Sequence, residues 1–167
     1  EPLAAWVAEL LDGVVVVLDP GAPFAFLPEG VRTQMLARTD VWTSNAQEAS
    51  ELTGVEDPAE SPAAVADLLP AHAVVIVRDG PNGCWVHEAG GTIYIPGFPQ
   101  TPVDTNGAGD AHTGALVAER ALGTPWEEAA RRANAVGAIK VTRHGPATAP
   151  RRSEVDAFLA GWRPTRD

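Results

Sequence analysis

A short glycine-rich segment carries the residue types best suited to chemistry: Asp104-Thr105-Asn106-Gly107-Ala108-Gly109-Asp110. Two glycines around a small alanine let the backbone bend tightly and come close to a ligand. An alanine-rich stretch follows, so the amides of Gly107, Ala108 and Gly109 fall at a helix start, where they lack intrahelical partners. The helix dipole adds partial positive charge, and these amides therefore predict an anion hole. The carboxylate of Asp110, in the first helical turn, is placed to accept a proton from an attacking hydroxyl.

Other interpretations of this segment stay open on spacing alone. A tight turn before a helix is common, and the Asp110 carboxylate would then only interact favourably with the positive end of the helix dipole. The chain has no G-x-x-x-x-G-K-[ST] loop, and Gly107-x-Gly109 is next followed by Gly114, which is the wrong spacing for a dinucleotide fingerprint. A nicotinamide-binding domain is therefore disfavoured.

The segments around the turn alternate between strand and helix patterns. Apolar runs at Val14–Leu18 and Ala73–Val77 predict buried strands, Val41–Thr43 a short one, and Cys84–His87 with Thr92–Ile95 a hairpin. Helices are expected at Ala4–Leu11, Gly30–Thr39, Ala46–Leu52 (stopped by Gly54), Ser61–Leu69, from the glycine turn to about Leu122, from Thr124 to Thr142, and from Ser153 through Trp162. Asn45, Ser61, Thr124 and Ser153 are expected to cap helices. Strand-helix-strand units predict an α/β fold.

Composition excludes several classes of function. The formal net charge of -10 disfavours nucleic acid and anionic membranes as partners. The single cysteine, Cys84, permits no internal disulfide, which fits a protein of the reducing cytoplasm. This cysteine is expected to be a small buried residue. Apolar runs such as Val14–Leu18 are far too short to span a bilayer. The histidines show no zinc-ligand spacing, and the pairs Arg131-Arg132 and Arg151-Arg152 are expected on solvated faces.

The segment from Asp104 to Asp110, extended by Gly114-Ala115, resembles the D-T-x-G-A-G-D signature of the ribokinase family of carbohydrate kinases, the phosphofructokinase-B type. Other stretches resemble the family in the same order: Val16–Pro20, Asn45–Glu48 with Leu52-Thr53-Gly54, Val75–Gly80 with Gly83, and Ala138–Gly145 with Phe158-Leu159. The resemblance covers nearly the whole chain, but only the C-terminal half or somewhat more of the family's chain. It implies a three-layer α/β/α sandwich with a mostly parallel sheet and a small hairpin, incomplete at the N-terminus.

The same resemblance implies roles for individual residues. Asp110 matches the catalytic base, and Gly107, Ala108 and Gly109 match the anion hole. The residues matched to ATP and phosphate binding are Asn45, Glu48, Arg78, Gly80, Gly83 and Asn134. Asn45 and Glu48 also have capping-box spacing, so a purely structural role is the alternative for them. A lone helical asparagine such as Asn134 is more often a solvated residue.

ATP and Mg²⁺ are the cofactors that the resemblance implies. Glu48 is expected to hold Mg²⁺ through water, since Mg²⁺ usually keeps several waters. A monovalent cation such as K⁺ would lie at Asp104, Asn106, Arg143 and Gly145, bound partly by backbone carbonyls. This chain departs from the family in having Arg78 where threonine is frequent and His112, expected to be a packing residue, where an aromatic residue is frequent.

The family's N-terminal portion, which carries most acceptor contacts and a β-sheet lid, has no counterpart here. Residues 1–167 are thus expected to be the nucleotide-binding and catalytic part of one ribokinase-like domain, lacking the acceptor-binding part and lid. The implied function is ATP-dependent phosphorylation of a hydroxyl on a sugar or sugar-like molecule, with a nucleoside or sugar phosphate as alternative acceptors. A non-catalytic nucleotide-binding fragment is the alternative of another class. A homodimer is a further expectation, and the sequence does not name the acceptor.

Overall fold

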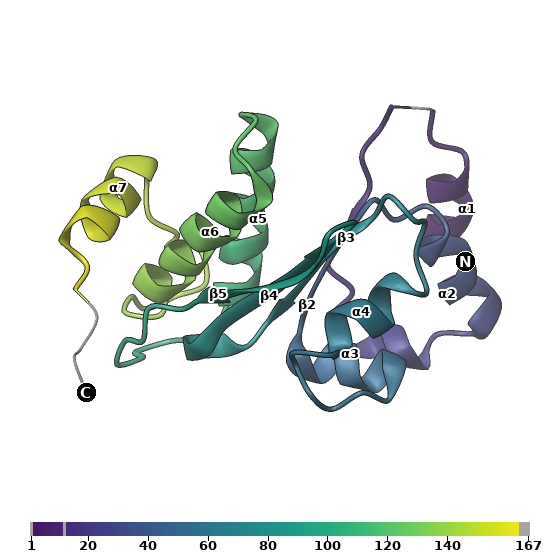
Figure 1. The fold of residues 1–167 in the computed structure, drawn as a ribbon, viewed down its shortest axis with the longest axis horizontal. Helices are drawn as coiled ribbons and strands as arrows, with labels where there is room; N and C mark the ends of the chain where they lie inside the picture. Colours follow the sequence, from purple (N-terminus) through teal and green to yellow (C-terminus); the bar gives the residue numbers. More distant parts are fainter. Residues whose placement is uncertain (1, 12, 164–167) are drawn as a thin grey trace. The chain divides into compact units, whose positions relative to one another are not determined.

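A computed structural model describes residues 2–11 and 13–163, which form two compact units. The first unit runs to Gly80 and includes Cys84–Tyr94, and the second consists of Pro81–Gly83 and the chain from Ile95 onward. Figure 1 follows the chain through both. Among the described residues, no helix is long and apolar enough to cross a membrane.

A five-stranded mixed sheet runs in the order β1-β2-β3-β4-β5. Its strands are β1 (Val17–Leu18), β2 (Val41–Asn45), β3 (Val74–Arg78), β4 (Gly83–Glu88) and β5 (Gly91–Pro96). The pairs β1-β2 and β2-β3 are parallel and β3-β4 is antiparallel, which confirms the predicted α/β class. The first strand is shorter than the apolar run Val14–Leu18 suggested, because only two of its residues pair with β2.

Apolar side chains on one side of β2 and β3 form the core of the first unit. The helices that cover it are α1 (Pro2–Ala8), the 3₁₀ helix η1 (Ala22–Phe26), α2 (Glu29–Leu36), α3 (Ala46–Thr53) and α4 (Ser61–Ala66). Trp42 is fully buried and meets Phe24 edge-on, with ring centroids 5.5 Å apart. Val75 and Val77 of β3 are also fully buried, as their place in a parallel strand requires. The helices are shorter than predicted at Ala4–Leu11, Gly30–Thr39 and Ser61–Leu69.

Of the helix-end predictions in the first unit, those at Asn45 and Gly54 are confirmed and the one at Ser61 is wrong. The Asn45 side chain accepts the amide of Glu48 at 2.8 Å, and the Glu48 carboxylate accepts the amide of Asn45 at 2.9 Å, so the capping box at α3 is confirmed. Gly54 ends α3 with φ 77°. The cap predicted at Ser61 is wrong: its amide donates to the Asp57 carbonyl, and its buried hydroxyl has no partner in the described chain.

The second unit packs three helices around its own core. After a short 3₁₀ turn η2 (Gly80–Asn82), its elements are α5 (Ala108–Ala121), α6 (Trp126–Lys140) and α7 (Arg152–Gly161). Phe98, Phe158 and Trp162 form an aromatic cluster with centroid separations of 5.2 to 5.5 Å. Ser153 does not cap α7, because the helix begins at Arg152 and Arg151 occupies the capping position, where its amide donates to the Glu154 carboxylate.

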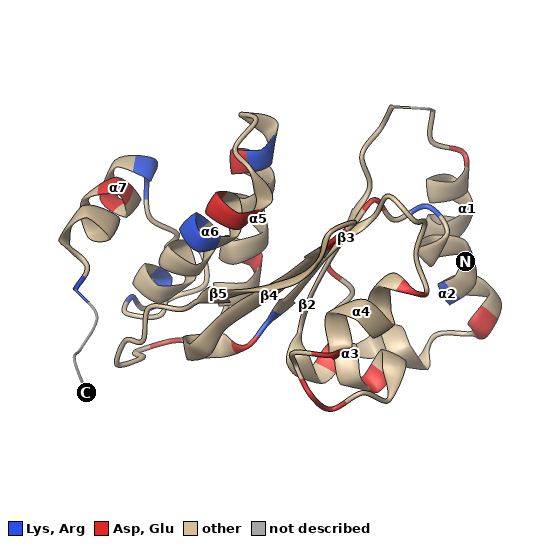
Figure 2. Cartoon of the chain, viewed as in Figure 1, with Lys and Arg blue, Asp and Glu red and all other residues tan. Residues whose placement is uncertain are grey.

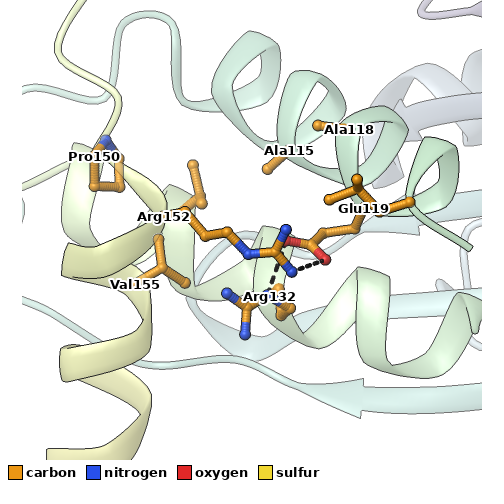
Figure 3. Close-up of a pocket in the computed structure, with 9 residues that line it drawn as sticks. Ala115, Ala118, Glu119, Arg132, Pro150, Arg152 and Val155 are labelled. Atoms are coloured by element: carbon orange, nitrogen blue, oxygen red, sulfur yellow. Dashed lines mark hydrogen bonds and ion pairs between the residues drawn. The ribbon is translucent and has the colours of Figure 1, made fainter. Parts of the chain in front are cut away.

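A nearly buried carboxylate, Glu119 on α5, overturns two further predictions. It accepts Arg132 Nε and an Arg152 guanidinium N–H, each at 3.0 Å. Arg132 is only 13% exposed, so the solvated position predicted for it is wrong, whereas Arg152 is 54% exposed, as predicted. Glu119 also accepts the hydroxyl of Thr124 at 2.9 Å, which explains why Thr124 does not cap α6. A cavity of about 180 Å³ opens beside this cluster, between α5, α6 and the start of α7 (Figure 3).

Candidate active site

Three polar side chains follow the carboxyl ends of the parallel strands in the first unit. Asp19 comes directly after β1, Asn45 ends β2 and Arg78 ends β3, with Asn45 and Arg78 in register. The carboxyl ends of parallel strands share one edge of a sheet, and in open α/β sheets ligands bind at this edge. The predicted residues Asn45, Glu48 and Arg78 are therefore brought together at the edge where a ligand is expected.

Arg78 is engaged by the acidic side chains around it. Its two terminal nitrogens donate to the two carboxylate oxygens of Asp19 at 3.1 and 3.2 Å, and one also donates to the hydroxyl of Thr43 at 2.7 Å. A Glu48 oxygen lies 3.9 Å from the other nitrogen. The side chains of Arg78 and Glu48 are only 12% and 13% exposed, so this charge is screened little by solvent. The planar guanidinium of an arginine can donate two parallel N–H hydrogen bonds to two oxygens of a phosphate, as it does to the two oxygens of a carboxylate.

Mg²⁺ fits this edge through few protein ligands. Among the residues described, no three His, Cys, Asp or Glu side chains converge on a common point. One oxygen of the Glu48 carboxylate accepts the Asn45 amide, so the other oxygen is available to a hydrated ion. Mg²⁺ bound with a nucleotide takes most of its ligands from water and phosphate, and one carboxylate suffices to orient it.

The glycine turn in the second unit has the geometry of an anion-binding helix start. Gly107 precedes α5 with φ 76°, and a Cβ on it would lie 2.7 Å from the carbonyl oxygen of Pro146, so no other residue fits without strain. The amide of Ala108 donates to the Thr105 carbonyl at 3.1 Å. The amides of Gly109 and Asp110 have no partner in the described part of the chain, which leaves them available to an anion. The Asp110 side chain is exposed in the first turn of α5.

Asp104 ties the two ends of this turn together. Its carboxylate accepts the amide of Asn106 at 2.9 Å and the amide of Gly145 at 2.8 Å, across 41 residues of sequence in the latter case. These two hydrogen bonds to the charged form lower the pKa of the Asp104 carboxyl from its ordinary value of 3.8, and Lys140 and His144 add to the effect. The backbone carbonyl of Asp104 accepts Lys140 Nζ at 2.7 Å. Arg143, predicted to lie near a cation, directs its side chain to Glu154 and the carbonyl of Thr148.

The remaining predicted residues have evident packing roles. A Cβ on Gly83 would lie 2.1 Å from the carbonyl oxygen of Ile95, so this glycine lets two backbone segments meet. Gly80 has φ 53°, and no described atom lies within 4 Å of the position that a Cβ would take, so only its backbone conformation requires glycine. Asn134 is buried: its side-chain carbonyl accepts a hydrogen bond from His112 Nε2 at 3.0 Å, and its side-chain amide donates to the carbonyls of Ile95 and Pro96. His112 is thus a packing residue, as predicted.

Two residues at these sites escaped the sequence analysis. Asp19 was covered only within the family-like stretch Val16–Pro20, although a carboxylate after a buried strand is a signal for a ligand edge. Lys140 was passed over within the stretch Ala138-Ile139-Lys140-Val141, where a charge among apolar helix residues could have suggested burial.

Comparison with known proteins agrees with this geometry. The model of the pfkB family of carbohydrate kinases matches residues 3–152. The chain belongs to this family. Its sheet and glycine turn are therefore those of an ATP-dependent carbohydrate kinase family, although the chain spans about half the length of the curated relatives it matches.

Several individual relatives and solved structures are similar to this chain over about half of their own length. The chain is 35% identical to the ATP-dependent ribose-1-phosphate kinase of Halopiger xanaduensis over 89% of its own length and 47% of the relative's. It is also 35% identical to the ribokinase of Haemophilus influenzae, over 94% and 51% of the two chains. An Escherichia coli structure described as a ribokinase II with ATP and Mg²⁺ superposes with a TM-score of 0.77 at 29% identity, covering 89% of this chain and 49% of that one. A Burkholderia thailandensis nucleoside kinase in complex with inosine gives 0.78 at 26% identity, covering 95% and 51%.

Proposed function

We propose that this chain supplies the nucleotide-binding and catalytic part of an ATP-dependent kinase that phosphorylates a hydroxyl of a sugar or sugar-like small molecule. The observation that carries the proposal is the turn before α5. There the amides of Gly109 and Asp110, without partners in the described chain, lie beside a left-handed Gly107, with an exposed carboxylate in the same turn. Amides held in advance stabilise the charge of a transferring phosphoryl group without reorganising, which is the main demand of this reaction.

Asp110 is the general base in this proposal. Its carboxylate takes the proton of the acceptor hydroxyl as the oxygen attacks phosphorus, while the first-turn amides hold the transferring group. A base in this position contributes roughly 10² to 10⁴ in rate. Asn45, Glu48 and Arg78 are proposed to orient the nucleotide phosphates, with Mg²⁺ held through water at Glu48 and supplying charge neutralisation when bound. Gly80, Gly83 and Asn134 shape the nucleotide pocket through backbone and packing.

The proposed fold of the complete domain is the family's three-layer α/β/α sandwich with a mostly parallel sheet. The parallel arrangement of β1, β2 and β3, with β4 turned antiparallel beside them, supports it. An acceptor-binding part and lid would complete the site. The acceptor proposed is a sugar, with a sugar phosphate or a nucleoside as the alternatives, since relatives named for ribose 1-phosphate and inosine are both similar to this chain. A homodimer stays a prediction, to be checked by light scattering.

Replacing Asp110 with Asn in the complete protein tests the role of the base. Asn keeps the size of the side chain but cannot take a proton, so turnover should fall by about 10² or more while the dissociation constant for Mg-ATP stays within about twofold. Assays would use Mg-ATP with ribose, fructose, ribose 1-phosphate and inosine as acceptors. The matched control is Glu127→Gln, since Glu127 is an exposed acid in the first turn of α6 and lies outside the glycine turn.

The outcomes separate the proposal from its rival. Turnover by the Asp110→Asn protein at the rate of the Glu127→Gln control would remove Asp110 from the mechanism. Saturable Mg-ATP binding with no turnover on any acceptor, by protein with Asp110 intact, would favour a non-catalytic nucleotide-binding role.

A further inference from the structure

The only lysine in this chain is fully buried. Lys140 lies at the end of α6 with no exposed surface. A lysine ammonium is almost never fully buried without a partner, because removing its charge from water is costly. The partner here is Asp104: Lys140 Nζ donates to its backbone carbonyl at 2.7 Å, and its carboxylate attracts the ammonium.

The end of α6 holds Asp104 from two directions. Besides the Lys140 contact, the carbonyl of Val141 accepts the amides of Val103 at 2.7 Å and Asp104 at 3.1 Å. Asp104 in turn accepts the amides of Asn106 and Gly145, which lie in the two loops that meet at Gly107. The ammonium therefore contacts Asp104, the residue that links the two loops around the glycine turn.

Four of the oxygens that could bind a K⁺ ion at this position already accept hydrogen bonds. The Asp104 carbonyl accepts the ammonium, and each of its carboxylate oxygens accepts a backbone amide. The Gly145 carbonyl accepts the hydroxyl of Thr148 at 3.0 Å. A K⁺ ion bound to these oxygens would have to compete with these donors and lie close to the fixed positive charge of Lys140. The donor set therefore does not fit the exchangeable cation that the sequence predicted at Asp104, Asn106, Arg143 and Gly145.

We propose that the Lys140 ammonium is itself the resident monovalent cation of the glycine turn, so that this protein positions Asp104 to Gly109 without K⁺. The proposal rests on the proposed function in taking this turn as the phosphate-binding element. An ammonium carries the single charge of K⁺ and has a similar size, but it donates directed hydrogen bonds and cannot dissociate. Lys140 is a positioning residue: it acts on the phosphate through Asp104 and the turn.

The test compares cations and lysine variants in the complete protein. Mg-ATP affinity and melting temperature are measured in tetramethylammonium chloride, a large inert cation, and again with KCl or NH₄Cl at the same ionic strength. For the unaltered protein, K⁺ should change the Mg-ATP dissociation constant by less than about twofold. Lys140→Ala should weaken binding about tenfold in tetramethylammonium, since a charge-assisted hydrogen bond is lost, and NH₄⁺ or K⁺ should recover most of that loss by filling the vacated space.

Lys140→Met serves as the second variant because it fills the same space with an apolar chain and is expected to fold. It should weaken Mg-ATP binding like Lys140→Ala, without recovery by any cation. Arg131→Met is the matched control: it removes one positive charge from α6 where the side chain is 43% exposed, and should behave like the unaltered protein.

Each outcome decides the inference. Stronger Mg-ATP binding by the unaltered protein in K⁺, by fivefold or so, would show an exchangeable cation site and overturn it. Unchanged Mg-ATP affinity in Lys140→Met would reduce Lys140 to a packing residue, and no recovery of Lys140→Ala by NH₄⁺ or K⁺ would show that the ammonium does not act as a cation at this position. The melting temperature is measured without nucleotide, so it tests the inference even if Mg-ATP does not bind. Recovery of the Lys140→Ala melting temperature by NH₄⁺ or K⁺ would support the inference, and no recovery would overturn it. A failure to bind Mg-ATP would count against the proposed function alone.

Discussion

The first unit carries three arginines against fourteen acidic residues, a net charge of -11, whereas the second carries nine basic residues against eight acidic ones, a net charge of +1. Figure 2 shows basic residues on each of α5, α6 and α7. In the first unit a lone arginine, Arg78, is held among carboxylates at the ends of the strands. In the second, backbone amides and one buried ammonium shape the turn.

The difference shows two ways of presenting positive charge to a phosphate in an acidic chain. The first unit uses the charge of a side chain, Arg78, which Asp19 and Glu48 already balance. The second uses fixed dipoles, which cost nothing to hold in place and cannot be neutralised by a neighbour. Side-chain substitutions should therefore act most on the first unit's site, and backbone substitutions on the second's.

Gly107→Ala should have the largest effect. The left-handed backbone and the 2.7 Å approach to Pro146 both exclude a Cβ, so the free energy of unfolding should fall by about 2–3 kcal/mol. Mg-ATP binding should weaken with it, as measured by calorimetry. Gly114→Ala, in the same helix with open space around it, should be neutral or stabilising by about 0.5–1 kcal/mol. Equal stability of the two variants would contradict a backbone requirement at Gly107.

Arg78→Met tests the side-chain site and should come next. It leaves Asp19 and Glu48 without their shared cation, so the free energy of unfolding should fall by about 2 kcal/mol. A cycle with Asp19→Asn should give a coupling of about 1 kcal/mol or more by urea unfolding. Additive losses would mean that the bidentate pair contributes nothing. Arg131→Met, an exposed pair with Glu128 at 3.6 Å, should cost no more than about 0.5 kcal/mol.

Glu119→Gln separates stability from binding within the second unit. The carboxylate joins Arg132, Arg152 and Thr124, so its neutralisation should lower the free energy of unfolding by about 1–2 kcal/mol. The Mg-ATP dissociation constant should stay within about twofold, because this cluster lies at the end of α5 away from its first turn. A tenfold loss of affinity would assign the cavity beside Glu119 a part in nucleotide binding.

The sequence predicted local features well and tertiary partners poorly. The capping box at Asn45, the glycine stop at Gly54 and the helix after the glycine turn depend on residues a few positions apart, and each is confirmed. The caps expected at Ser61, Thr124 and Ser153 are wrong. The helices α4 and α7 begin at Ser61 and Arg152, so both serines lie inside them, and the Thr124 hydroxyl donates to Glu119 instead.

The site divides in the same way. The turn from Asp104 to Asp110 could be predicted because its meaning lies in one short segment. The partners of Arg78 and of Asp104 could not, since Asp19 lies 59 residues from Arg78, and Lys140 lies 36 residues from Asp104. Only the pairing of strands and the end of α6 bring those groups together.

The smallest effects concern pH and distinguish two carboxylates with lowered pKa values, one in each unit. Burial alone would raise the pKa of Asp40, but the Val16 amide and the His72 ring outweigh it. The pKa of Asp104 is lowered chiefly by the amides of Asn106 and Gly145. Because both folded-state values lie below the ordinary 3.8, each group stabilises the protein above that pH, and the contribution disappears as the pH falls through the lowered value.

Asp40→Asn and Asp104→Asn should therefore each lower the melting temperature at pH 7, and each difference from the unaltered protein should shrink below about pH 4. Only Asp104→Asn should also weaken Mg-ATP binding at pH 7, because only Asp104 holds the glycine turn. Melting curves from pH 2.5 to 7, with calorimetric titration at pH 7, measure both effects. A melting-temperature deficit that persists unchanged at pH 2.5 would show that the carboxylate's charge is not the cause, and equal loss of Mg-ATP affinity in both variants would break the distinction between the two units.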